Sequence, residues 1–89
     1  MERKYLIGEI ISFCFEYKVF TKKVNIREIK ESIDRQLEDT IFIENLINMI
    51  ICKTKYRKNV DVARIKRLLL ALEKIRLEME YDGNQGRKC

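Results

Sequence analysis

Apolar residues recur at intervals of three and four along most of this chain, and this spacing favours packed helices. Near the amino terminus the apolar positions are Leu6, Ile10, Phe13, Tyr17 and Phe20. Such intervals place side chains on one face of an α-helix, whereas a half-buried strand alternates apolar and polar residues. The chain also contains no proline, the residue that most disrupts helix interiors. Although isoleucine favours strands by propensity, the spacing carries more weight and predicts a helix over residues 2–20.

A polar joint separates this first helix from the next apolar stripe. Asn25 stands three residues before Glu28, a spacing typical of a capping box, in which each side chain satisfies the other residue's backbone amide. The stripe that follows predicts a helix over residues 25–38. Its register is lost near Asp39 and Thr40, either of which can cap a new helix.

A third helical segment is predicted over residues 40–53. The pattern does not distinguish a separate helix from a kinked continuation of the second one, and the run Ile41-Phe42-Ile43 is also compatible with a short strand. Residues 41–52 are apolar nearly all round, which predicts burial on most sides.

The last helix is predicted over residues 60–82, with Asp61 or Asn59 as its cap and Gly83 as a left-handed stop. Residues 84–89 are polar and are expected to form a flexible tail. The sequence therefore predicts an all-α fold, a small bundle of three to four helices that forms a single domain over residues 1–83.

The composition argues against catalysis. With no histidine, the chain lacks the commonest general base and the commonest zinc ligand. It has no glycine-rich phosphate loop, and its three cysteines, Cys14, Cys52 and Cys89, are too widely spaced for a metal motif. We therefore expect no enzyme, no catalytic residue, no cofactor and no metal site. The odd, scattered cysteines predict reduced thiols in the cytoplasm, and no apolar run is long enough for a membrane span.

Positive charge is concentrated in residues 53–67, which carry seven bases and one acid, whereas the rest of the chain carries 12 bases and 13 acids. Such a segment can bind nucleic acid or another polyanion, can bind an acidic protein surface, or can simply be a solvated connection. An interleaved tyrosine can stack on a base. The candidate binding residues are Lys53, Lys55, Tyr56, Arg57, Lys58, Arg64, Lys66 and Arg67.

Two helices have apolar residues on the side opposite their main stripe. On the last helix these residues lie about 120–160° from Ile65 at 100° per residue. They can be scattered surface residues, can be covered by the chain's own helices if one of these helices is central, or can contact another chain. We prefer a contact with another chain, because small chains bury little surface alone. The candidate interface residues are Ile11, Phe15, Val19, Ala63, Leu70, Leu77 and Tyr81.

These features predict a small helical protein that works by binding. The first hypothesis is a non-catalytic interaction protein that regulates or inhibits a macromolecular protein partner as a homodimer. The alternative is a nucleic-acid-binding regulator that uses residues 53–67. Neither hypothesis involves a membrane.

Overall fold

The computed structural model describes residues 2–20 and 23–88, with the side chains of residues 81–88 left out of the description. Within these ranges the chain forms no strand and four helices, α1 (Arg3–Glu16), α2 (Ile26–Gln36), α3 (Thr40–Lys55) and α4 (Val62–Lys88). The predicted all-α class is confirmed. The second and third helices are separate rather than continuous, and residues 41–43 belong to a helix rather than a strand.

Polar side chains mark three of the helix starts, as the sequence predicted. In each case a side-chain oxygen accepts a hydrogen bond from a backbone N–H that has no partner inside the helix. The pairs are Asn25 with Glu28 (3.3 Å), Asp39 with Ile41 (2.9 Å) and Asp61 with Arg64 (3.1 Å).

Helix α1 ends four residues earlier than predicted. Lys18 adopts a positive φ of 56°, the left-handed conformation that stops a helix. The backbone N–H of Lys18 donates to the carbonyl oxygen of Phe15 (3.3 Å), and the backbone N–H of Val19 donates to the carbonyl oxygen of Cys14 (2.8 Å). This is the hydrogen-bond pattern of a Schellman motif, which glycine usually closes. With lysine in that place, the sequence carries no obvious stop signal.

Helix α4 continues beyond its predicted stop. The helix runs through Gly83 and Gly86 to Lys88, so Gly83 does not end it. Glycine weakens a helix by roughly 1 kcal/mol but does not forbid it. The backbone of residues 84–88 is helical.

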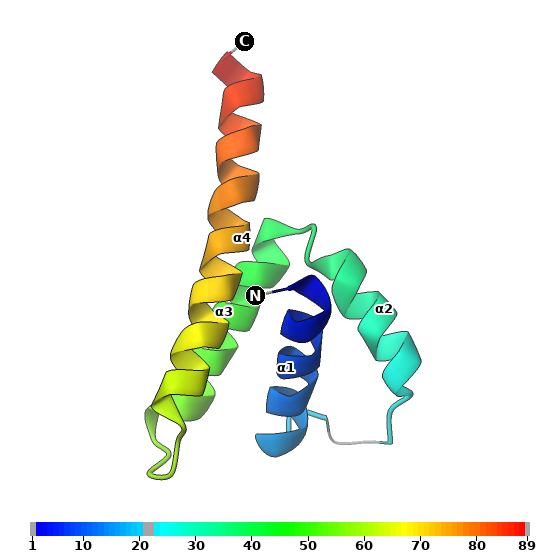
Figure 1. The fold of residues 1–89 in the computed structure, drawn as a ribbon, viewed down its shortest axis with the longest axis vertical. Coiled ribbons are helices and arrows are strands. Elements are labelled where there is room, and N and C mark those ends of the chain that lie inside the picture. Colours follow the sequence, from blue (N-terminus) through cyan, green and yellow to red (C-terminus); the bar gives the residue numbers. More distant parts are fainter. Residues whose placement is uncertain (1, 21–22, 89) are drawn as a thin grey trace.

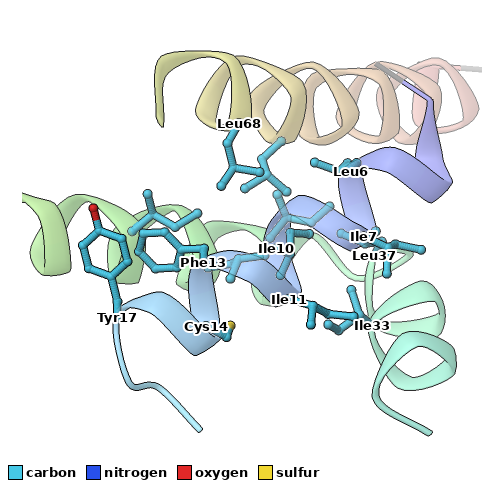
Figure 2. Close-up of a cluster of buried hydrophobic side chains, with 14 residues drawn as sticks. Leu6, Ile7, Ile10, Ile11, Phe13, Cys14, Tyr17, Ile33, Leu37 and Leu68 are labelled. Carbon is cyan, nitrogen blue, oxygen red and sulfur yellow. The ribbon is translucent and has the colours of Figure 1, made fainter. Parts of the chain in front are cut away.

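The other three helices pack around α1, which lies between α2 and the α3–α4 hairpin (Figure 1). Helix α4 packs mainly on α3, and α1 contacts both α2 and α4. Figure 2 shows the apolar side chains that meet between the helices. Those with almost no exposed surface are Leu6, Ile10, Leu37, Ile43, Ile50, Leu68 and Leu72.

Helix α3 is buried on one side only, in contrast to the prediction. Its buried residues are Ile43, Leu46 and Ile50, whereas Ile41 is 65% exposed and Ile51 is 46% exposed. Although α3 is apolar on nearly every side, Ile41 and Ile51 remain in solvent, because no described segment covers the side on which they lie. We call this side the back of α3.

Candidate interaction surfaces

The outer face of α4 carries an apolar stripe that its own bundle leaves uncovered. Leu70 is 69% exposed and Leu77 is 52% exposed, and Ala63 is exposed as well. Their spacing of seven residues places all three on one side of the helix, opposite Leu68 and Leu72 in the core. We call Ala63, Leu70 and Leu77 the outer stripe. Tyr81, predicted to extend this stripe, lies outside the side chains that the structure describes.

Helix α4 is much longer than the helix on which it packs. It has 27 residues and α3 has 16. At 1.5 Å per residue the difference is about 16 Å. Figure 1 shows the carboxyl-terminal part of α4, orange to red, standing clear of the other helices. The difference corresponds to 11 residues, and an isolated helix shorter than about 12–15 residues is marginal in water, so packing on another surface would stabilise the protruding part.

Three carboxylates surround one arginine beside this uncovered part of α4. Arg76 Nη1 lies 3.0 Å from Glu80 and 3.6 Å from Glu44, and Nη2 pairs with Glu73. The hydrogen bond from Arg76 lowers the pKa of Glu73 below its ordinary value, which keeps this carboxylate ionised. One positive charge against three negative charges leaves the group with a net charge of −2.

The candidate interface on α1 is largely covered by the chain itself. Ile11 is only 6% exposed, and Figure 2 shows it beside Ile33 of α2. The prediction that Ile11 belongs to a free surface is therefore wrong. Val19 folds back onto the core, and the half-exposed Phe15 packs edge-on against Phe20 with ring centroids 5.2 Å apart. The central helix of this bundle is α1, which explains its two apolar sides.

The basic residues of segment 53–67 do not form one surface. Arg64 is half-buried and pairs with α1, where its Nε lies 2.7 Å from Glu9 and its Nη1 lies 4.0 Å from Glu16. Arg64 therefore joins α4 to α1 and stands apart from the other basic residues. Lys66 and Arg67 are exposed on α4, where Arg67 lines a shallow groove with Leu70.

The remaining basic residues cluster at the connection between α3 and α4. We call residues 53–58 the basic turn. Tyr56 is 84% exposed, and Lys55 Nζ lies 5.5 Å from the centroid of its ring. Arg57 stacks on Tyr17, with 4.4 Å from its Cζ to the ring centroid. Lys53 and Lys58 are exposed beside them. This end of the molecule therefore presents several cations and one free aromatic face.

Sequence reasoning missed one side chain next to the outer stripe. Tyr5 of α1 is 60% exposed and lines the same groove as Leu70, Arg67 and Lys74. Its position off the main stripe of α1 is visible in the sequence, but its proximity to α4 depends on how the two helices pack.

Comparisons with protein-family models, curated proteins and solved structures found no match to this chain. Among the described residues, no helix combines the length and apolar character needed to cross a membrane. The same residues contain no group of three or more acidic or cysteine side chains arranged to hold a metal ion.

Proposed function

We propose that this chain is a non-catalytic helical interaction protein that regulates or inhibits a macromolecular protein partner and self-associates through the outer stripe of α4. The observation that carries the proposal is the exposure of Leu70 and Leu77 on a helix that extends beyond its bundle. Single exposed leucines are common, but two aligned ones on a protruding helix favour a helix–helix contact. Burial of each leucine would contribute roughly 1.5–3 kcal/mol by transfer from water.

The cytoplasm remains the proposed compartment for this activity. Cys14 and Cys52 are free thiols, and Cys14 is buried in the core. Free thiols are typical of proteins in a reducing environment.

The experiment is the double substitution Leu70→Lys/Leu77→Lys, analysed by sedimentation velocity and circular dichroism. We expect the unmodified chain to sediment as a dimer and the variant as a monomer of unchanged helicity, because both side chains lie outside the core. The matched control is Ile41→Lys/Ile51→Lys, which adds the same charges to the exposed back of α3. The proposal fails if the unmodified chain is monomeric at all concentrations, or if only the α3 control dissociates the dimer.

We propose polyanion binding at the basic turn as the second candidate function. The observation that favours it is the exposed ring of Tyr56 among Lys53, Lys55 and Lys58. Bases stack on such rings while lysines neutralise phosphates. We expect Lys53→Gln/Lys55→Gln/Lys58→Gln to weaken retention by single-stranded nucleic acid and to lower the salt slope by about two, at about 0.7 per phosphate contact.

The matched control for this test carries Lys4→Gln, Arg27→Gln and Lys30→Gln, which remove three exposed cations from α1 and α2. It should retain most of the binding. Equal loss in both triple variants would show that only net charge matters, and the absence of binding at low salt would remove this function.

A further inference from the structure

The charges that flank the outer stripe reverse sign along α4. Lys66 and Arg67 flank its beginning, and Glu78 and Glu80 flank its end. At 100° per residue, Lys66 and Glu80 lie on one side of the stripe, and Arg67 and Glu78 lie on the other. Each flank is therefore basic near the amino end of the helix and acidic near its carboxyl end. Between these levels, Lys74 lies on the flank of Arg67 and Glu73 lies on the flank of Lys66.

We propose that the outer stripe binds the same stripe of a second copy of this chain, with the two α4 helices antiparallel. This inference rests on the proposed self-association and adds its orientation. Leu70 of each chain packs against Leu77 of the second copy. In an antiparallel pair corresponding flanks meet in reverse order, so Lys66 faces Glu80 and Arg67 faces Glu78. When Leu70 is level with Leu77 of the second copy, the two residues of each charge pair are offset from each other by at most two residues, about 3 Å along the helix axis.

The opposite orientation brings like charges together. In a parallel pair, opposite flanks meet at the same level, so Lys66 faces Arg67 and Glu78 faces Glu80. Charges beside an apolar seam set the orientation of paired helices in this way, because like charges at close range destabilise the wrong arrangement.

Lys74 and Glu73 flank the middle of the stripe, so in the antiparallel pair each meets its own copy, whereas in the parallel pair they meet each other. Counted over both chains, the antiparallel pair has four attractive and two repulsive contacts, and the parallel pair has two attractive and four repulsive ones. The charge pattern therefore favours the antiparallel pair.

The arginine-centred cluster on α4 has the charge that this arrangement requires. Glu80 shares Arg76 with Glu73 and Glu44, so its carboxylate is only partly compensated within its own chain. Lys66 of the second copy brings a further cation to the same carboxylate. An added positive charge is favourable next to a group whose net charge is −2.

The antiparallel pair also gives the protruding part of α4 a surface on which to pack. The protruding part of each helix lies along the bundle of the other chain, beside Tyr5 and the groove that Tyr5 lines with Leu70. The two basic turns then lie at opposite ends of the dimer. From the rise per residue along α4, they are roughly 40 Å apart.

Disulfide trapping tests the orientation. In a Cys52→Ser/Cys89→Ser background, Leu70→Cys and Leu77→Cys proteins are prepared separately, mixed and oxidised. We expect the mixture to form a covalent dimer and each protein alone to remain uncoupled, because identical positions are separated by about 10 Å along the axis. Efficient coupling of each protein alone would show a parallel pair and overturn the inference while leaving self-association intact. A monomeric unmodified chain would overturn both.

Charge reversal tests the ion pairs. We expect Arg67→Glu and Glu78→Arg each to weaken the dimer about tenfold, and the double variant Arg67→Glu/Glu78→Arg to restore most of the affinity. The control is Arg27→Glu on α2, which makes the same charge change at an exposed site away from α4 and should leave the dimer unchanged. Additive weakening in the double variant would overturn the proposed pairing of Arg67 with Glu78.

Discussion

Arg64 of α4 and Glu9 of α1 form a paired hydrogen-bond contact that joins positions 55 residues apart. The Nε of Arg64 donates to Oε2 of Glu9 over 2.7 Å, and Nη2 donates to Oε1 over 3.2 Å. The carboxylate is well shielded, with 15% of the Glu9 side chain exposed against 40% for Arg64. The hydrogen bond to Glu9 is the main reason why the pKa of Arg64 is raised.

We expect Glu9→Ala and Arg64→Ala each to lower the free energy of unfolding by about 1 kcal/mol, a value that allows for the exposure of Arg64. Urea denaturation of the single and double variants measures the coupling between the two side chains. Because the guanidinium of Arg64 is paired with Glu9 of its own chain, Arg64→Gln should leave polyanion binding unchanged. Fully additive losses would contradict the pairing.

Lys18 is the residue at which a substitution should stabilise the fold. A side chain in the left-handed conformation costs roughly 1 kcal/mol relative to glycine, and Lys18 holds φ at 56° where α1 ends. We expect Lys18→Gly to raise the free energy of unfolding by about 0.5–1 kcal/mol in urea denaturation. The control Lys23→Gly, at an exposed site without that conformation, should not stabilise. A destabilised Lys18→Gly protein would contradict a left-handed helix stop at this residue.

Two isoleucines on α3 test how that helix is buried. Ile43 has no exposed surface, whereas Ile41 is 65% exposed. We expect Ile43→Ala to cost about 2–5 kcal/mol through lost burial and a cavity, and Ile41→Ala to stay within about 0.5 kcal/mol of the unmodified protein. Thermal or urea unfolding measures both. Equal costs would mean that the back of α3 is covered.

The thiols should differ in reactivity. Burial raises the pKa of the Cys14 thiol, and Cys52 is exposed. In a thiol-reagent assay at neutral pH, a Cys14→Ser/Cys89→Ser protein should react at once through Cys52. A Cys52→Ser/Cys89→Ser protein should react only on unfolding.

The same shift predicts a pH effect on stability. Because the folded pKa of Cys14 lies above the unfolded value, its contribution to folding is complete below the ordinary thiol pKa and is lost as the pH rises through the folded pKa. Rapid reaction of Cys14 in the folded protein, or stability that increases with pH in this range, would contradict the burial of this side chain.

The helical segments were predictable because each has an apolar stripe at helical spacing, although this pattern left open whether residues 25–53 form one helix or two. The caps at Asn25, Asp39 and Asp61 follow from short-range chemistry. Contacts between distant segments were not predictable. The sequence does not reveal that Glu9 meets Arg64, or that α2 covers Ile11.

Helix ends were missed for a local reason. Lysine rather than glycine occupies the left-handed position at Lys18, and Gly83 lies inside a helix rather than at its end. The outer stripe was predictable in part: periodicity places Leu70 and Leu77 away from the core, and both are exposed. The same reasoning failed on α1, because periodicity does not show which helix is central.

The measurement that tests the account most directly is sedimentation equilibrium of the unmodified chain over a wide range of concentrations. The chain has a mass of 10.8 kDa. If the outer stripe of α4 is an interface between two copies, the apparent mass rises with concentration to twice this value. The Leu70→Lys/Leu77→Lys variant then keeps the mass of one chain throughout. A monomer mass for the unmodified chain at every concentration would contradict the account.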